Sequence, residues 1–354
     1  MDARLELLKK LTDVNGVPGY ESEVADLIAG EMKGFADISY DKIGSIICKK
    51  EGSSDKPRIM LPGHMDEVGF MATSISDDGY IKFTTLGGWI PYYLLSQRVV
   101  IKTSKGILEG MIGSKPPHIM TEEERKKLPD KKDLYVDIGV KDKKEATAKG
   151  VKPGDPIIPV AQFTVMANPD YLLAKAWDDR IGCALFIEVI KALHGKKHPN
   201  TVYGVGTVQE EVGCRGARTA AYNINPDVAI VCDVGISQDV PGGDKNLGAL
   251  GKGPQITIYD AGMIPNLGLR DFIVSIAEKK KIPYQFQTLG GGGTDGGPIH
   301  ISASGVPCVY IGVPSRYIHS HRGIIHRKDY ENTLKLVTEV ILQLDDKQIS
   351  KFSR

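Results

Sequence analysis

Charged and imidazole side chains follow the ends of apolar runs that lie far apart in the chain. Three such runs cover residues 59–61, 202–208 and 228–232. The polar residues that follow them are His64, Glu210, Glu211 and Asp233. Short apolar runs are typical of buried strands, and the carboxyl ends of parallel strands meet at one edge of a sheet. The pattern therefore predicts a fold that gathers these side chains at one sheet edge.

Two further segments add residues of the same kinds. Asp178 and Asp179 stand at the start of an apolar helical pattern at 179–193, and His319 follows a later apolar run. Taken singly, such a residue is more often a helix cap, a solvated charge or a structural histidine. Taken together, two histidines and several carboxylates from distant segments match the ligand inventory of a dinuclear metal site.

The hydrophobic patterns predict an α/β chain that is interrupted by a β-rich stretch. Helical spacing covers residues 2–11 and 21–33, whereas residues 68–164 alternate in polarity between Asp-Gly and Lys-Gly turns. Helix and strand patterns then resume at 179–193, 201–208, 228–232, 270–280, 306–311 and 328–344. Because loops accept insertions at little entropic cost, we expect an α/β domain of residues 1–67 and 165–354 with a small β-domain, residues 68–164, inserted into it.

The composition excludes several classes of function. The net charge is +1 and no basic stripe is interleaved with aromatic residues, which argues against nucleic acid as the main partner. The first ten residues are charged rather than those of a signal peptide, and no apolar stretch approaches the roughly 20 residues of a membrane span. We therefore expect a cytoplasmic protein that does not bind membranes. Its five cysteines lack a CxxC spacing and are expected to be reduced, buried thiols.

The residue types indicate hydrolytic metal chemistry. Carboxylate oxygens together with imidazole nitrogens suit zinc, cobalt or manganese. Two such ions lower the pKa of a shared water, and a carboxylate outside the ligand set must accept its proton. The adjacent residues Glu210 and Glu211 offer one carboxylate as a metal ligand and one as the proton acceptor. Asp66, two residues after His64, is expected to orient that imidazole by hydrogen bonding.

Six motifs spread over nearly the whole chain identify a family. They are Gly16-Val17-Pro18-Gly19-Tyr20-Glu21, His64-Met65-Asp66-Glu67-Val68-Gly69, Trp177-Asp178-Asp179-Arg180, Val208-Gln209-Glu210-Glu211-Val212-Gly213 with Arg215-Gly216-Ala217, Gly292-Gly293-Thr294-Asp295 and Arg316-Tyr317-Ile318-His319-Ser320. With these motifs in this order, the chain resembles the TET-type dinuclear metallo-aminopeptidases, a family also described as glutamyl aminopeptidases, cellulase-M-like proteins or endoglucanases.

The resemblance implies a complete ligand set. One divalent ion would be held by His64, Asp178 and Asp233, and a second by Asp178, Glu211 and His319, so that Asp178 bridges the two. Zinc or cobalt is implied, with manganese as a further option. The resemblance also implies a cis peptide bond between Asp178 and Asp179.

The same resemblance implies an activity, a fold and an assembly. The activity is removal of the amino-terminal residue from short peptides through a metal-bridging water, with Glu210 as general base and acid. Asp66, which is expected to orient His64, is the second residue that we predict to be catalytic. The implied fold is a phosphorylase/hydrolase-like zinc-peptidase domain with an inserted, PDZ-like β-barrel that serves dimerisation. The implied assembly is a homododecamer, built from dimers into a hollow tetrahedral particle.

Several alternatives stay open at the level of sequence. His321 follows His319 closely and competes with it for the ligand role. The Gly-rich segment 290–293 is interpreted as backbone that approaches the substrate closely, which glycine permits, and its other interpretation is a flexible turn. A metal-dependent deacylase or carboxypeptidase on the same fold is the main alternative function. A glycoside hydrolase has no need of two metal-directed histidines, and a non-catalytic assembly protein has no need of Glu210. Neither the preferred amino-terminal residue nor the native metal follows from the sequence.

Overall fold

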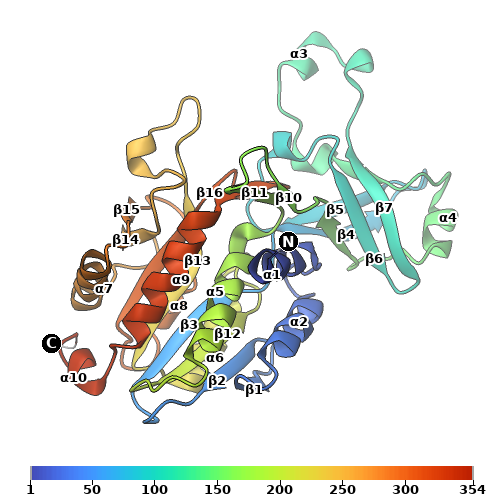
Figure 1. Ribbon diagram of the computed structural model, residues 1–354. Helices are drawn as coiled ribbons and strands as arrows, with labels where there is room; N and C mark the ends of the chain where they lie inside the picture. The colour runs from blue at the N-terminus through green and yellow to red at the C-terminus, as the bar shows by residue number, and fades with distance from the viewer. Residues whose placement is uncertain (1, 353–354) are drawn as a thin grey trace.

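The structure, a computed structural model, describes residues 2–352 and has two parts, a large mixed sheet and a closed barrel (Figure 1). The sheet has 11 strands, of which nine follow the order β1-β2-β12-β3-β13-β16-β17-β11-β10, and β14 and β15 join it through β16. Their bounds are β1 Asp37–Tyr40, β2 Ile46–Lys50, β3 Arg58–His64, β10 Thr164–Val165, β11 Tyr171–Ala174, β12 Thr201–Thr207, β13 Val228–Ile236, β14 Gln255–Tyr259, β15 Gln285–Thr288, β16 Cys308–Arg316 and β17 Gly323–His326.

The four central strands, β12, β3, β13 and β16, run parallel, as their apolar runs predict. Both faces of the sheet are covered by helices. These helices are α1 Ala3–Asp13, α2 Ser22–Met32, α5 Trp177–Leu193, α6 Arg215–Ile224, α7 Leu267–Lys280, α8 Gly296–His300 and α9 Arg327–Ile341, with α10 Asp346–Ile349 near the C-terminus. Side chains of α1, α2, α5, α7 and α9 form one hydrophobic core with the sheet, and α6 and α8 contribute to a second, smaller core. The central strands are therefore buried on both sides, so their polar residues can act only where the strands end.

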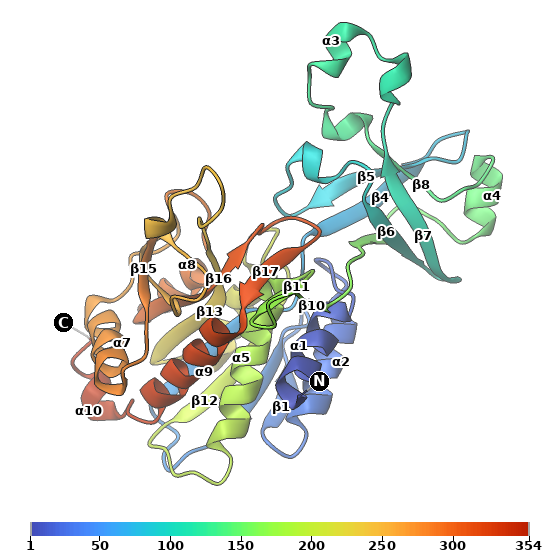
Figure 2. The same cartoon turned by 45° about the horizontal axis from the view of Figure 1, so that its top comes forward.

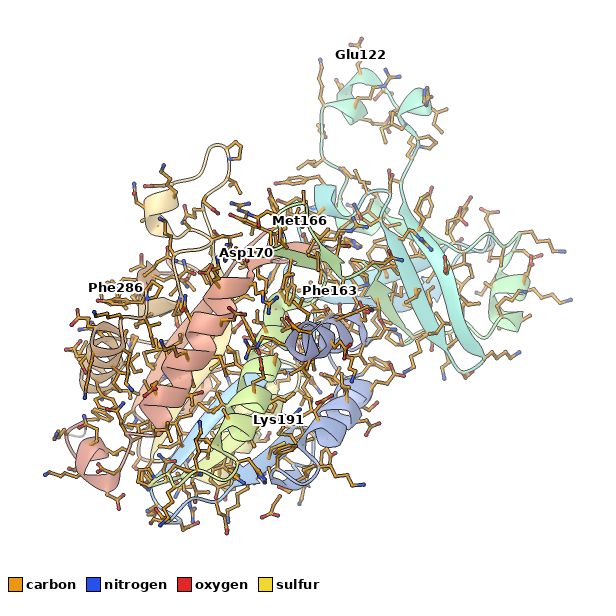
Figure 3. The ribbon with its side chains drawn as sticks, viewed as in Figure 1. Glu122, Phe163, Met166, Asp170, Lys191 and Phe286 are labelled. Carbon is orange, nitrogen blue, oxygen red and sulfur yellow. The ribbon has the colours of Figure 1, made fainter. Side chains whose placement is uncertain are left out.

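The barrel is built from one continuous stretch of chain. Its strands close in the order β4-β5-β8-β7-β6-β9. Their bounds are β4 Gly69–Ile75, β5 Ile81–Leu86, β6 Arg98–Thr103, β7 Gly106–Gly113, β8 Tyr135–Asp137 and β9 Pro156–Pro159, and the short helices α3 Glu122–Arg125 and α4 Lys143–Ala148 lie between them. Figure 2 shows the barrel beside the sheet, with the α3 segment projecting away from both. Glu122 marks the tip of that projection in Figure 3. The predicted β-rich insertion is thus a closed barrel with its own hydrophobic core.

One buried arginine ties together the segments that carry the strand-end residues. Arg180 is 0% exposed, and its guanidinium donates to the carbonyls of Met65 at 2.7 Å, Leu11 at 2.7 Å, Val14 at 2.9 Å and Gly16 at 3.1 Å. These bonds join the first turn of α5, the end of α1 and the segment that follows β3. Nearby, the buried Glu67 pairs with Lys175 and lies 3.4 Å from the guanidinium.

Among residues 2–352, no helix has the length and apolar character that crossing a bilayer requires.

Replacing Arg180 by methionine is expected to lower the free energy of unfolding by about 3 to 5 kcal/mol. The substitution removes the donor of the buried Leu11 and Met65 carbonyls and one of two donors of the Val14 and Gly16 carbonyls, and loss of a buried charged partner has a cost of this size. Guanidinium unfolding of Arg180→Met measures the effect. Arg218→Met is the matched control, since Arg218 is exposed on α6 and its change is expected to stay within about 0.5 kcal/mol. Equal unfolding midpoints for the two variants would show that Arg180 does not have this role.

Candidate metal centre

The carboxyl ends of the central strands bring the predicted polar residues to one edge of the sheet. His64 is the last residue of β3 and is paired with Thr207, the last residue of β12. Glu210 and Glu211 follow the end of β12 after two intervening residues, and Asp233 lies in the second half of β13. The sequence therefore predicted this edge correctly, because each polar residue stands at the point where a buried strand reaches the surface.

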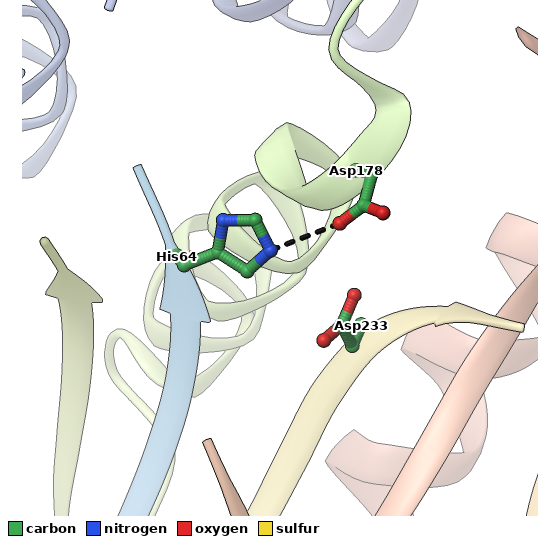
Figure 4. A group of neighbouring side chains, drawn as sticks. All are labelled: His64, Asp178 and Asp233. Atoms are coloured by element: carbon green, nitrogen blue, oxygen red, sulfur yellow. Dashed lines mark hydrogen bonds and ion pairs between the residues drawn. The ribbon is translucent and has the colours of Figure 1, made fainter. Parts of the chain in front are cut away.

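The first ligand group joins His64, Asp178 and Asp233 (Figure 4). The three residues can each offer one ligand atom, and these atoms lie within 4.8 Å of one another. His64 Nε2 is 2.9 Å from Asp178 Oδ1, and Asp233 points toward the same space from β13. His64 is 2% exposed and Asp233 is 6% exposed, so the group is sheltered from solvent.

The second ligand group joins Asp178, Glu211 and His319. Its ligand atoms also lie within 4.8 Å of one another. His319 Nε2 is 3.4 Å from Asp178 Oδ2 and 3.5 Å from Glu211 Oε2. Asp178 turns one oxygen toward each group, so it is the residue that the two groups share.

The two aspartates at the start of α5 point in different directions. The peptide bond between Asp178 and Asp179 is cis, as the family resemblance implied. Asp178 faces the two ligand groups, whereas Asp179 accepts hydrogen bonds from the backbone N–H of His64 at 3.0 Å and of Gly182 at 2.9 Å. Asp179 therefore holds the end of β3 against α5, and only Asp178 is available as a ligand.

Asp66 lies next to His64 as expected, but its contacts differ from the predicted ones. The hydrogen bond to His64 Nδ1 involves the main-chain carbonyl of Asp66 at 2.9 Å, while the carboxylate is 3.6 Å away. A carbonyl only accepts, so Nδ1 carries the proton and Nε2 is the nitrogen that faces the ligand group. The carboxylate instead accepts from the backbone N–H of Glu210 at 3.0 Å and of Glu211 at 3.1 Å. Asp66 thus fixes both the imidazole and the backbone of the two glutamates.

The electrostatics of the two groups suit bound cations. Burial raises the pKa of Glu211 and of Asp233 well above the usual range, and the nearby Asp178 carboxylate raises both further. Among the described residues, Glu211 Oε1 is buried and has no hydrogen-bond partner. Against the lowering effect of burial, Asp178 and Glu211 raise the pKa of His319 to about 10, but neither lysine nor arginine is among the described residues that line the site. Buried carboxylates in excess of their cationic partners are unfavourable unless a further cation neutralises them. Oxygen and imidazole donors in this arrangement fit two divalent ions.

Glu210 lies beside both groups and belongs to neither. Its Oε2 is 3.9 Å from His64 Nε2, and its Oε1 accepts from the Cys214 thiol at 3.2 Å. Glu210, Cys214 and Asp295 form a third cluster, in which Asp295 is 2% exposed and accepts from the Thr207 hydroxyl. Neither Cys214 nor Asp295 was among the site residues predicted from the sequence. The position of Cys214, four residues after Glu210, was the available signal.

His321 does not approach either ligand group. Its ring lies 5.1 Å from that of Trp89 and 6.4 Å from that of Phe70, both in the barrel, as centroid distances. Burial lowers the pKa of His321 to about 4, with Arg322 as a further cause. Neither ring nitrogen has a hydrogen-bond partner among the described residues. The choice between the two histidines therefore falls on His319, while His321 packs where the loop meets the barrel.

A cavity of about 520 Å³ lies at the edge of the sheet where these residues meet. It is lined by all six residues of interest, which are His64, Asp178, Glu210, Glu211, Asp233 and His319. Gly291, Gly292 and Gly293 form part of its wall, in line with the prediction that backbone of this segment approaches a ligand. A cavity of this size accommodates a small organic molecule or a short peptide end.

The chain is similar along its whole length to named aminopeptidases. It is 33% identical to a glutamyl aminopeptidase of Lactococcus lactis, with 97% of each chain covered, and 34% identical to a lysyl aminopeptidase of Pyrococcus furiosus, with 96% of this chain and 97% of the relative covered. Among solved structures, a TET aminopeptidase from a Thaumarchaeota archaeon superposes with a TM-score of 0.97 at 46% identity, covering 99% of both chains.

For one further solved relative, an assembly into a closed shell is described. The TET1 peptidase of Pyrococcus horikoshii, which is described as assembling into a tetrahedron or a large octahedral shell, matches with a TM-score of 0.87 at 35% identity over 97% of this chain and 100% of that chain. Finally, the sequence model of the M42 glutamyl aminopeptidase family matches residues 44–336. With this match over most of its length and with relatives above 30% identity, the chain belongs to the M42 family of aminopeptidases.

Proposed function

We propose that the protein is a dinuclear metallo-aminopeptidase that releases the amino-terminal residue of short peptides. The observation that carries the proposal is the pair of ligand groups that share Asp178, with Glu210 beside them and outside both. His64, Asp178 and Asp233 would hold one divalent ion, and Asp178, Glu211 and His319 the other. Such a pair of ions, zinc or cobalt, would supply an acidified water and polarise the substrate carbonyl.

Glu210 is the residue that moves the proton. As a carboxylate that is not needed as a ligand, it accepts the proton of the attacking water and passes it to the leaving amine. The Cys214 thiol holds Oε1 of Glu210, so Oε2 is the oxygen on the side of His64 and the ligand groups. Asp66 supports this geometry, because its carboxylate fixes the backbone N–H of Glu210 and its carbonyl fixes the His64 ring.

The acidic wall of the cavity also selects for a free amine. When the scissile carbonyl lies between the ligand groups, the α-amine of the first residue falls among Glu210, Glu211 and Asp233. A protonated or metal-bound amine is well matched to these carboxylates, while an acylated nitrogen leaves them unpaired. The arrangement therefore favours exopeptidase action from the amino end.

We further propose that the chain forms a homo-oligomer, by analogy with the shell described for Pyrococcus horikoshii TET1. The barrel, residues 69–159, is proposed as the dimerisation domain, because it is a separately packed unit that projects from the sheet. A shell would restrict access to short peptides. Light scattering of the purified protein tests the assembly independently of activity.

His319→Ala is expected to reduce bound metal from about two ions per chain toward one, because it removes a ligand of only one proposed ion. His321→Ala is the matched control and should leave the stoichiometry unchanged, since that ring contacts Trp89 instead. Elemental analysis after loading with zinc and removal of excess metal measures both variants. Loss of an ion in the control alone would transfer the ligand role to His321.

The function itself is tested by turnover of amino-acid nitroanilides after loading with cobalt or zinc. Chelation of the metal should abolish release of nitroaniline, and return of the metal should restore it. Release from amino-acid nitroanilides supports the proposal. Absence of release, together with hydrolysis of N-acylated amino acids or of carboxy-terminal residues, would identify a deacylase or carboxypeptidase instead.

A further inference from the structure

The cavity has an apolar part beyond the proposed metal ligands. Its wall there is formed by Val234 and Ile236 at the end of β13, Leu289 after β15, and Ile318 next to His319. The Gly291–Gly293 segment completes the wall and adds only backbone. Thr294 and Tyr310 also line the cavity, but both hydroxyls are engaged within the protein: the Gly296 N–H donates to Thr294 Oγ1 at 3.2 Å, and the Tyr310 hydroxyl donates to the Val234 carbonyl. A substrate side chain that leaves the metal centre on this side therefore meets aliphatic groups, main chain and hydroxyls that already have partners, and no charged group.

The charges of the cavity are all accounted for. Its acidic lining residues are Asp178, Glu210, Glu211 and Asp233, and each already has a part in the proposed metal and proton chemistry. Neither lysine nor arginine occurs among the lining residues that the structure describes. Of the arginines near lining residues in sequence, Arg215, next to Cys214, donates to Gln209 Oε1 at 2.9 Å, and Arg316, two residues before Ile318, is held by Asp239, with its Nε donating at 2.8 Å. The apolar part thus offers no counter-charge to a charged substrate side chain.

We propose that this part of the cavity is the pocket for the first side chain of the substrate and that it selects uncharged aliphatic residues such as leucine and methionine. The inference rests on the proposed aminopeptidase function and narrows its substrate class. A buried charge without a partner is strongly unfavourable, whereas an aliphatic side chain gains from burial. Glutamate and lysine at this position are therefore both rejected.

Relatives of this chain differ in the amino-terminal residue for which they are named, so the substrate preference depends on residues that differ between them. At similar identity, one is named for glutamyl and another for lysyl substrates. The metal-centre residues serve every amino terminus, so residues around them must set the preference. In this chain Ile236 is 43% exposed at the last position of β13, where a longer, charged side chain is sterically permitted. We assign Ile236 as a residue that determines specificity.

The first experiment compares leucine, methionine, glutamate and lysine nitroanilides on the cobalt-loaded protein. We expect kcat/KM for leucine and methionine to exceed that for glutamate and lysine by about 10²-fold or more, the range over which pocket contacts discriminate. Equal or faster turnover of the glutamate or lysine substrate would overturn the proposed pocket and leave the aminopeptidase function intact. Absence of turnover with all four substrates, at two bound ions per chain, would overturn the function itself.

The second experiment tests Ile236 directly through Ile236→Arg. The introduced cation should raise the ratio of glutamate to leucine kcat/KM by about 10-fold or more, because it supplies the missing counter-charge. Ile43→Arg is the matched control, since Ile43 is 42% exposed, lies between β1 and β2, and is not among the cavity-lining residues. The control should keep the ratio of the unmodified protein. An unchanged ratio in Ile236→Arg, with metal content retained, would remove Ile236 from the pocket wall.

Discussion

Glu210→Gln is expected to lower kcat by about 10² to 10⁴-fold, the usual contribution of general acid and base catalysis. The amide has nearly the same size and hydrogen-bonding reach as the carboxylate, but it does not accept the proton of the attacking water. Because Glu210 belongs to neither ligand group that shares Asp178, both metal ions should remain bound. Steady-state kinetics and elemental analysis of the same preparation measure the two effects together.

Glu211→Gln is the matched comparison for that variant. Glu211 lies in the second ligand group, with Oε2 at 3.5 Å from His319 Nε2. This substitution should lower metal occupancy toward one ion per chain, and added metal should restore part of the activity. Near-normal turnover in Glu210→Gln would show that Glu210 is not the proton carrier. Loss of metal from the same variant would show that Glu210 is a ligand.

N-acetylation of a tetrapeptide substrate is expected to lower kcat/KM on the order of 10³-fold, because it leaves buried acidic groups unpaired. Glu210, Glu211 and Asp233 line the cavity, so a free α-amine meets acidic groups and the proposed ions there, whereas an acylated nitrogen offers neither a positive charge nor a lone pair for a metal. Mass spectrometry of the products from free and acetylated versions of one tetrapeptide measures the difference. Comparable cleavage of the two peptides would indicate an endopeptidase or deacylase.

The buried part of the fold could be predicted because burial leaves a pattern in sequence. The runs at 202–208 and 228–232 became the central strands β12 and β13, and the predicted helix at 179–193 became α5. At the site, two strands extend beyond the ends of their predicted runs: β3 continues through Pro62 and Gly63 to His64, and β13 extends to Ile236. Neighbouring strands hold these ends in register, which is information that no single run contains.

Peripheral strands escaped prediction for the opposite reason. β1 and β10 are mostly exposed, and β10 consists of only two residues, so neither has an apolar pattern. They are held only by their pairing with β2 and β11, each on one side. Such edge strands depend on tertiary context more than on their own residues.

The sequence predicted which residues form the candidate site, but it did not predict the direction in which their side chains point. The family resemblance implied that His64, Asp178 and Asp233 are neighbours, and the structure places them together. The direction in which a side chain points depends on local backbone geometry, which explains why the Asp66 carboxylate bonds to the backbone of the glutamates. For the same reason Cys214, whose position opens α6, faces Glu210 although its sequence neighbours suggested only a buried thiol.

The central claim is that two ions share Asp178, and anomalous diffraction from crystals of the zinc-loaded protein tests it most directly. Data collected above and below the zinc absorption edge locate each ion without reference to activity. We expect two peaks per chain, one among His64, Asp178 and Asp233 and one among Asp178, Glu211 and His319. A single peak, or a peak in the cluster of Glu210, Cys214 and Asp295 in place of either, would contradict the proposed centre.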